Sequence, residues 1–300
     1  MVYELIIIGA GPAGITAAIY AARKRLNFLV ITRVIGGQLM NNAFIENYTG
    51  YQEISGAELV SKFEEHLKEF KFDLEMDEVI NISIKNDIFQ VRTKSNDFKS
   101  KTLIIAAGTS PRKLNVKGEE EFLNRGVTYC ATCDGPLFLE KDVAIIGGGN
   151  SAFETAIQLM AIANKIYMID IAEDLIGDKI LIDKVRAHAK VEIFSSSSLK
   201  AIKGDKFVEK IEFEQKGQIK IKNVQGVFIE IGYIPQTSIF KDLVELNAKD
   251  EIITDRFKKT SRPGVFAAGD CTDIPFKQII ISGGDGAVAA LSAFQFLSKI

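Results

Sequence analysis

The chain has 300 residues, nearly half of them apolar, which is enough material for two domains of ordinary size. Its 37 basic and 39 acidic residues give a formal net charge of −2, and no segment collects one sign of charge. This balance argues against a nucleic-acid surface or a polybasic membrane anchor. Three cysteines are too few for a secreted disulfide scaffold, so we expect a cytoplasmic protein.

The first element is the apolar run at residues 5–8, whose β-branched residues predict a buried parallel strand. Residues 5–22 carry no charge and are about long enough to cross a bilayer. Glycines and a proline interrupt this stretch, and no basic segment flanks it, so we interpret it as a strand, a tight loop and a helix over 15–22. No membrane association is therefore expected, and a second strand is predicted at 27–31.

The loop that follows the first strand is a glycine-rich turn of the GxGxxG type. It contains Gly9, Gly11, Pro12, Ala13 and Gly14. Between a strand and a helix, such a turn predicts a dinucleotide site, because the missing side chains let a pyrophosphate reach backbone N–H groups at the helix N-terminus. A purely structural turn is the alternative.

The same unit recurs later in the chain. A strand at 142–146 leads into the GxGxxA turn at 147–152, followed by a helix at 153–160 and a strand at 165–169. Two occurrences make chance matches improbable and predict two nucleotide-binding domains.

Between the two turns, Cys130 and Cys133 are separated by two residues. Two thiols at this spacing can close a disulfide with little backbone movement, and the setting tends to lower one thiol pKa. A zinc site would need further ligands from Cys271, His66 or His188, and none of these has metal-ligand spacing, so no metal is expected. The arrangement instead favours a relay from nicotinamide to flavin to disulfide to a partner.

The residues that end the second strand of each unit differ in charge. Asp170 ends the strand after the second turn, where a carboxylate can accept both ribose hydroxyls of an adenosine and repels a 2′-phosphate. The alternative is a solvated residue without this role. The matching position after the first turn is Thr32, followed by Arg33, so the first site must hold its ribose in another way.

Two strand-to-turn segments, at 103–111 and 231–235, mark the domain boundaries, and a short strand at 265–268 precedes a helix from about 284 to 297. The simplest organisation inserts the second domain into the first. We therefore expect an α/β fold with two Rossmann-like domains, each of three layers (ββα). The expected bounds are 1–110 with 236–300 for the first domain and 111–235 for the inserted domain.

The chain resembles the low-molecular-weight thioredoxin reductases, the second class of pyridine nucleotide-disulfide oxidoreductases, essentially from end to end. The matching segments are residues 9–14, 36–39, 46–48, 130–135, 147–152 and 267–270, with Lys277 and Gln278. Within the family, residues 126–130, 135–138 and 276–281 are most similar to the reductase portion of the alkyl hydroperoxide reductase flavoprotein. That flavoprotein carries extra thioredoxin-like domains ahead of the matched portion, whereas this chain starts at the first flavin strand. The resemblance therefore implies transfer to a separate thioredoxin- or glutaredoxin-like protein, and a homodimer.

The resemblance assigns FAD to the first domain. The implied FAD contacts are Gly9, Gly11, Pro12, Ala13, Gly14, Gly36, Gly37, Gln38, Asn47, Gly108, Gly269, Asp270, Lys277, Gln278 and Ile279. Gln38 and Asn47 would lie near the isoalloxazine ring, although each could instead only shape a turn. Asp270 would hold the ribityl or pyrophosphate region. Lys277 and Gln278 would lead into a helix whose positive end stabilises the reduced flavin.

The inserted domain is expected to bind NADH. The implied contacts are Gly147, Gly149, Asn150, Ser151, Ala152, Asp170 and Gly232. NADPH-using members carry His-Arg-Arg-x-x-x-Arg just past this strand, whereas here the corresponding places hold Asp170, Ile171, Ala172 and Ile176. No cation remains to pair a 2′-phosphate, which favours NADH over NADPH. A ferredoxin-dependent or NADPH-dependent thioredoxin reductase is the alternative, although the intact GxGxxA turn favours a nucleotide over ferredoxin.

By resemblance, Cys133 faces the flavin, Cys130 attacks the partner disulfide, and Asp134 manages the thiol protons as general acid or base. A non-catalytic redox sensor that binds FAD and switches a partner through its dithiol is the competing hypothesis. Because dithiol and nicotinamide must both reach one flavin, we expect the inserted domain to rotate about hinges at 109–112 and 232–236.

Overall fold

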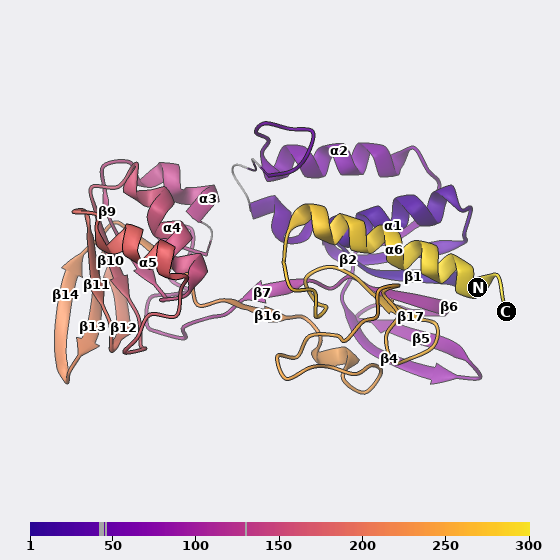
Figure 1. Cartoon of the computed structure of the whole chain (residues 1–300). Helices are drawn as coiled ribbons and strands as arrows, with labels where there is room; N and C mark the ends of the chain where they lie inside the picture. Colours follow the sequence, from indigo (N-terminus) through magenta and orange to yellow (C-terminus); the bar gives the residue numbers. More distant parts are fainter. Residues whose placement is uncertain (42–44, 46, 130) are drawn as a thin grey trace. The chain divides into compact units, whose positions relative to one another are not determined.

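The computed structural model describes residues 1–41, 45, 47–129 and 131–300, and the side chains of Asn41, Thr132 and Cys133 lie outside this description. The chain divides into two compact units (Figure 1). Unit 1 comprises Met1–Ser110 and Ile234–Ile300, and unit 2 comprises Pro111–Tyr233. Unit 2 is thus inserted into unit 1, and the second crossing lies between residues 233 and 234 instead of 235 and 236.

Unit 1 is built on a seven-stranded sheet. Its strands are β1 (Tyr3–Ala10), β2 (Phe28–Ile35), β3 (Asp73–Glu75), β4 (Val79–Lys85), β5 (Ile88–Thr93), β6 (Asp97–Ile105) and β17 (Val265–Ala267). The order is β3-β2-β1-β6-β5-β4, with β17 paired to the end of β6. Ile7 of β1 lies opposite Val30 and Ile104 on its two parallel neighbours, and all three side chains are buried. The apolar run therefore forms a central strand covered on both faces.

The helices of unit 1 are α1 (Pro12–Arg23), α2 (Gly56–Lys68) and α6 (Ile279–Leu297), with a 3-10 helix η1 at Gly37–Asn41. Figure 1 shows α1, α2 and α6 on the same side of the sheet. Helices α1 and α6 pack closely, since a Cβ added at Gly286 would lie 2.0 Å from the carbonyl oxygen of Ala13. The predicted start of the last helix near residue 284 is wrong, because α6 begins at Ile279. Glycines are typical of a helix break, but here they lie inside the helix and allow its close contact with α1.

The predicted starts of two other helices are also too late. Helix α1 begins at Pro12, where we predicted residue 15, and α4 begins at Asn150, where we predicted 153. In both cases the last residues of the glycine-rich turn already form the first helical turn. The strand predicted at 27–31 is β2, which starts one position later and continues to Ile35.

One helix among the described residues, α6, is long and apolar enough by length and composition to cross a membrane. It buries Ser282 and Asp285 and lies against α1 in unit 1, and the core helix of a soluble protein meets the same criterion. The earlier uncharged stretch at 5–22 forms β1, the glycine turn and α1, so its interpretation as a strand, loop and helix is confirmed.

Unit 2 contains a five-stranded sheet in which every pair is parallel. Its strands, in spatial order, are β11 (Val191–Phe194), β10 (Lys165–Ile169), β9 (Asp142–Ile146), β15 (Gly226–Ile229) and β8 (Val127–Thr128). An antiparallel sheet is formed by β12 (Ser197–Gly204), β13 (Val208–Gln215) and β14 (Gln218–Asn223). The helices are α3 (Ala131–Asp134), α4 (Asn150–Met160) and α5 (Lys179–Arg186), with a 3-10 helix η2 at Gly135–Phe138.

In Figure 1 the helices of unit 2 lie on one side of its parallel sheet and the antiparallel sheet on the other. Two separate apolar clusters fill the two spaces between these layers. The α/β fold with a three-layer inserted domain is therefore confirmed.

The two chain crossings lie side by side as the strands β7 (Thr109–Pro111) and β16 (Tyr233–Pro235), and η3 (Ser238–Phe240) follows. Gly108 and Gly232, which flank these strands, have positive φ angles of 68° and 90°. The backbone N–H of Gln236 donates to the carbonyl of Gly108 at 3.0 Å. The predicted hinges coincide with this ribbon, and their motion stays a prediction.

Candidate nucleotide sites and the dithiol segment

The first glycine turn joins β1 to α1 and leaves an open space above its central glycine. A Cβ added at Gly9 would lie 2.2 Å from the carbonyl oxygen of Ala106, and one at Gly14 would lie 1.9 Å from the carbonyl oxygen of Gly9. Within the described part of the chain, a Cβ added at Gly11 would meet nothing within 4 Å. Gly9 and Gly14 therefore permit close approach of strand, turn and helix, whereas Gly11 leaves room for a ligand.

The N-terminus of α1 is suited to an anion. Gly11 is the N-cap and Pro12 occupies the first turn; in the part of the chain that the structure describes, no side chain caps this end and its first turn holds no acidic residue. Proline has no N–H, and helix geometry leaves the N–H groups of Ala13 and Gly14 without intrahelical partners. These donors and the helix dipole together favour a phosphate.

A second pair of glycines, Gly36 and Gly37, lies directly beside this turn. The N–H of Gly36 donates to the carbonyl of Ala10 at 2.7 Å, and a Cβ at Gly37 would lie 3.5 Å from the Cα of Gly11. Both glycines have positive φ angles, of 89° and 55°, which side chains rarely adopt.

The two amides that we expected near a flavin ring each join separate segments of unit 1. The Nε2 of Gln38 donates to the Oγ1 of Thr109 at 2.7 Å. The Nδ2 of Asn47 donates to the Oε1 of Gln278, the N-cap residue of α6, at 3.0 Å. Both have a structural role, and a direct ligand contact of either stays a prediction.

The segment at Gly269 and Asp270 also reaches the first turn. A Cβ at Gly269 would lie 3.0 Å from the Cβ of Ala13. The Oδ1 of Asp270 accepts from the Oγ of Ser282 at 3.0 Å. Burial raises the pKa of Asp270, and the Ser282 hydrogen bond and nearby Lys277 oppose this rise. Residues distant in sequence thus meet at the α1 N-terminus.

Two buried charges behind this segment were missed by the sequence analysis. The Nζ of Lys258 pairs with the Oδ1 of Asp285 at 2.7 Å, and both side chains are almost fully buried. The Oδ2 of Asp285 lies 3.4 Å from the backbone nitrogen of Gly269, which donates to it. Nothing in the glycine-rich sequence around Asp285 distinguishes it from a loop residue.

Lys277 and Ile279 are placed at the entrance of α6. The Nζ of Lys277 pairs with the Oε1 of Glu251 at 2.8 Å and donates to the carbonyl of Thr272. Ile279 is the first residue of α6, and among the described residues no side chain caps this helix end. The lysine thus ties the chain ahead of α6 to a neighbouring segment. Its predicted cofactor contact is untested.

The second glycine turn repeats the geometry of the first. A Cβ added at Gly147 would lie 2.2 Å from the carbonyl oxygen of Glu230, and one at Gly149 would meet none of the residues that the structure describes within 4 Å. Ala152 holds the third position and is completely buried. Helix α4 starts with Gly149 as N-cap, and within the described residues its first turn has no acidic residue and no side-chain cap.

Asp170 lies against this second turn. A Cβ at Gly148 would lie 2.7 Å from the Oδ2 of Asp170, whose Oδ1 accepts from the N–H of Ala172 at 2.6 Å. The N–H of Ile176 donates to the carbonyl of Gly148 at 3.2 Å, so the segment after β10 folds back over the turn. Asn150 holds this segment too, because its Oδ1 accepts from the N–H of Asp178 at 2.6 Å.

Glu230 is a further functional candidate that the sequence analysis missed. Its carboxylate accepts hydrogen bonds from the hydroxyls of Ser151 and Thr155, and burial raises its pKa. The sequence offered one signal for it: Glu230 is the single acid in the otherwise apolar run that ends at Gly232. A Cβ added at Gly232 would meet no atom of the described residues within 4 Å.

Cys130 lies outside the described residues. Cys133 belongs to α3, and its side chain is likewise outside the description. Asp134 ends α3 and is half-buried. The sulfur–sulfur pairing and the role of Asp134 stay predictions.

The chain just ahead of Cys130 is firmly held. The phenol of Tyr129 donates to the Oε1 of Glu119 at 2.7 Å, and the carboxylate of Glu119 also accepts from the N–H groups of Leu114 and Asn115. Burial and the neighbouring Glu119 carboxylate raise the pKa of Tyr129 far above its usual range. The segment that leads to the dithiol is therefore anchored at a buried carboxylate.

The third cysteine is chemically different. Cys271 is free and completely buried, and burial raises the pKa of its thiol to about 11. Reactive thiols are accessible and have lowered pKa values, so Cys271 does not fit a redox role. Among the described residues, no three His, Cys, Asp or Glu side chains form a cluster that could hold a metal ion.

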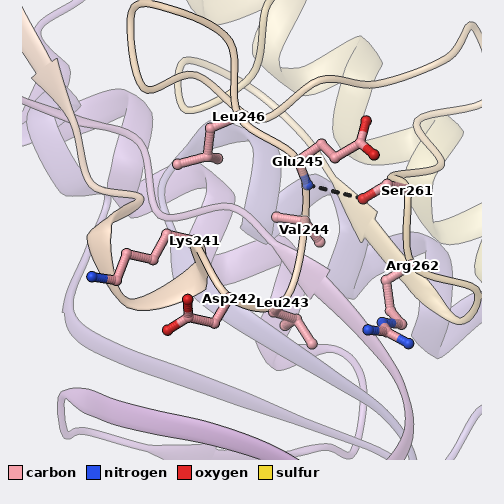
Figure 2. Close-up of a pocket in the computed structure, with 8 residues that line it drawn as sticks. All are labelled: Lys241, Asp242, Leu243, Val244, Glu245, Leu246, Ser261 and Arg262. Atoms are coloured by element: carbon pink, nitrogen blue, oxygen red, sulfur yellow. Dashed lines mark hydrogen bonds between the residues drawn. The ribbon is translucent and has the colours of Figure 1, made fainter.

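A shallow pocket of about 390 Å³ lies elsewhere in unit 1 (Figure 2). It is lined by residues 241–246 with Ser261 and Arg262, and the N–H of Glu245 donates to the Oγ of Ser261 at 2.9 Å. None of the expected cofactor contacts lines this pocket. It is separate from the glycine turn of unit 1.

The model of the pyridine nucleotide-disulphide oxidoreductase family matches residues 3–291. The chain belongs to this family. A Bacillus subtilis (strain 168) protein named NADH dehydrogenase is 42% identical over 300 residues, which cover 99% of this chain and 59% of that protein. Alkyl hydroperoxide reductase F of Staphylococcus aureus (strain MRSA252) is 41% identical over 309 residues, with the same shares. The chain thus spans about three fifths of these relatives.

Among solved structures, thioredoxin reductase of Lactococcus lactis superposes with a TM-score of 0.84 at 37% identity. The match covers 99% of this chain and all of that chain. The resemblance to the low-molecular-weight thioredoxin reductases is confirmed, and this pyridine nucleotide-disulphide oxidoreductase is of the thioredoxin reductase type.

Proposed function

We propose that this protein is a flavoprotein disulfide reductase. It passes electrons from NADH through FAD to a Cys130–Cys133 disulfide and then to a thioredoxin- or glutaredoxin-like protein. The observation that carries the proposal is the repeated turn geometry: each unit has a strand, an open central glycine and an uncapped helix N-terminus. Two such sites in a thioredoxin reductase-like chain suit two different dinucleotides.

The residues of unit 1 fit FAD. The open space at Gly11 and the N–H groups of Ala13 and Gly14 suit its pyrophosphate. The carboxylate of Asp270 would accept hydrogen bonds from the hydroxyl groups of the ribityl chain of FAD. When bound, FAD supplies the step that links a two-electron nicotinamide donor to a disulfide. The uncapped N-terminus of α6 would stabilise negative charge on the reduced ring.

The dithiol performs the chemistry that the protein itself contributes. Cys133 would face the flavin, and Cys130 would attack the disulfide of the partner as a thiolate. Asp134 would take up and return the thiol protons. Rotation of unit 2 about β7 and β16 would let the nicotinamide and the dithiol reach the ring in turn.

The open glycines provide a matched test of the two sites. Gly11→Val should leave the fold intact, because the added side chain enters open space and the residue has a φ of −75°. We expect it to weaken FAD binding about tenfold or more, because it blocks phosphate hydrogen bonds. Flavin absorbance per protein after gel filtration, with far-ultraviolet circular dichroism, measures both effects. Gly149→Val is the control: it should retain FAD and lose affinity for NAD⁺. Equal flavin content in both variants would contradict the assignment of FAD to unit 1.

NADH is the proposed donor because Asp170 occupies the turn where NADPH-using members place cations. Ile171 and Ile176 are each 80% exposed, and neither offers a charge to a phosphate. The name of the Bacillus subtilis relative, NADH dehydrogenase, agrees with this choice.

We expect kcat/KM to be about 100-fold higher with NADH than with NADPH, which corresponds to about 2.7 kcal/mol. Asp170→Asn should reduce this ratio at least about tenfold by removing the repulsion of the 2′-phosphate. Glu173→Gln, which neutralises an exposed acid in the same segment, should not change it. Steady-state rates with both nucleotides give the ratio. A wild-type preference for NADPH, or an unchanged ratio in Asp170→Asn, would contradict the proposal.

One anaerobic experiment separates the competing functions. The yellow protein is mixed with NADH, its flavin absorbance is followed, and disulfide substrates are then added. Bleaching followed by many turnovers supports the reductase. Bleaching without turnover identifies a sensor, and bleaching by reduced ferredoxin alone identifies a ferredoxin-fed enzyme.

A further inference from the structure

Glu230 lies directly beneath the second glycine turn. It follows the last residue of β15, and its N–H donates to the carbonyl of Ile146 at 2.8 Å. Its own carbonyl oxygen would lie only 2.2 Å from a Cβ added at Gly147, too close for a side chain there. The backbone of Glu230 therefore fixes the first glycine of the turn, and its side chain starts from a rigid position.

The side chain of Glu230 crosses to the first two turns of α4. Its Oε2 accepts from the hydroxyl of Ser151, and its Oε1 accepts from the Oγ1 of Thr155 at 2.9 Å. Ser151 and Thr155 are four residues apart and lie on one face of the helix. Glu230 is 9% exposed, whereas Ser151 is exposed at the helix N-terminus. A buried carboxylate thus holds a hydroxyl that a ligand can reach.

The hydrogen bond to Glu230 decides what Ser151 can recognise. A serine hydroxyl has one proton, and when that proton is donated to Glu230 the oxygen can only accept. Phosphate oxygens are acceptors, so Ser151 in this state is unsuited to the pyrophosphate. It is suited to a hydroxyl or amide N–H donor.

The strand order indicates which half of the dinucleotide carries that donor. Asp170, proposed for the adenosine ribose, follows β10, and Glu230 follows β15 on the other side of β9. A dinucleotide lies across the carboxyl ends of such strands, with its two halves on opposite sides of the turn. Ser151 and Glu230 therefore belong to the nicotinamide half.

We propose that Glu230 is a positioning residue that makes Ser151 an acceptor for a hydrogen-bond donor on the nicotinamide riboside half of NADH. The inference rests on the proposed function. Thr155 anchors the second oxygen of the carboxylate and has no part in recognition.

The test compares ligands that contain different parts of the dinucleotide. Isothermal titration of the flavin-loaded protein uses NAD⁺, which has both halves, and ADP, which lacks the nicotinamide half. We expect Ser151→Ala to weaken NAD⁺ binding about fivefold and Glu230→Gln about threefold, the range of one hydrogen bond. Binding of ADP should change less than about twofold in both variants.

Coupling between the variants tests the positioning role. In the Ser151→Ala background, Glu230→Gln should cause no further loss of NAD⁺ affinity. Ser151→Thr keeps a hydroxyl and should retain affinity, and Thr155→Val should also retain it. In steady state, the KM for NADH should rise with kcat unchanged in the Ser151 and Glu230 variants.

Three outcomes would overturn the inference: additive losses in the double variant, equal changes for NAD⁺ and ADP, or full affinity in Glu230→Gln. If Glu230→Gln fails to fold, the double variant Thr155→Val/Glu230→Met replaces it, because it leaves no unpaired polar group beneath the turn. It should show the same loss of NAD⁺ affinity. A wild-type protein that binds neither NAD⁺ nor ADP would instead refute the proposed function.

Discussion

Cys133→Ser is expected to abolish disulfide reduction while flavin reduction by NADH continues. A serine hydroxyl can neither form a disulfide nor serve as a thiolate nucleophile at neutral pH, so electrons would stop at the flavin. We expect turnover with a thioredoxin-like disulfide substrate to fall about 10⁴-fold or more, as when a catalytic nucleophile is removed. Anaerobic flavin bleaching by NADH and steady-state disulfide reduction measure the two half-reactions separately.

Cys271→Ser is the matched control for this experiment. Cys271 is completely buried, and its sulfur lies 3.5 Å from the carbonyl oxygen of Ala268, which a serine hydroxyl can use as acceptor. This variant should retain full turnover. Persistent turnover in a Cys130→Ser/Cys133→Ser protein would refute the dithiol mechanism.

Lys258→Met is expected to lower the free energy of unfolding by about 3–5 kcal/mol, because it leaves the buried carboxylate of Asp285 without its partner. The two side chains are only 10% and 9% exposed, so solvent cannot replace the lost ion pair. Lys258 is altered in preference to Asp285 because Asp285 also accepts from the N–H of Gly269, beside the proposed FAD site. Urea unfolding at one fixed concentration of FAD gives the change, since ligand binding itself adds stability.

An exposed ion pair serves as the comparison. Lys68→Met breaks the pair with Glu64 on α2, in which the lysine is 69% exposed, and should cost less than about 1 kcal/mol. The double variant Lys258→Met/Asp285→Leu should recover part of the loss, because it leaves no buried charge. Equal effects of Lys258→Met and Lys68→Met would show that the buried pair does not stabilise unit 1.

The strands and turns of both glycine-rich units could be predicted because their signals are local. The strands at 142–146 and 165–169 coincide with β9 and β10, since short apolar runs bounded by glycine or polar residues define a buried parallel strand. The spacing of Gly9, Gly11 and Gly14 is likewise visible along the chain, although the segment that a Cβ at Gly9 would meet, at Ala106, is distant in sequence.

The start of α6 could not be predicted in this way. The glycines at 283, 284 and 286 have low helix propensity and are typical of a loop. The structure continues the helix through them, because a glycine at 286 lets α6 approach Ala13 of α1. The packing of α6 against α1 outweighs the low helix propensity of these glycines. Because α1 is far away in the sequence, no pattern near residue 286 reveals this contact.

The sequence by itself determined that two glycine-rich turns flank Cys130 and Cys133, and that an acid, Asp170, follows the strand after the second turn. These features depend on residue type and spacing along the chain. Only the tertiary structure decided that the carboxylate of Glu230 accepts from the hydroxyl of Ser151 and that Lys258 pairs with Asp285. The physical reason is that the burial and pairing of a charge depend on which strands and helices become neighbours. A charged residue that no local pattern distinguishes needs a partner once folding removes it from water.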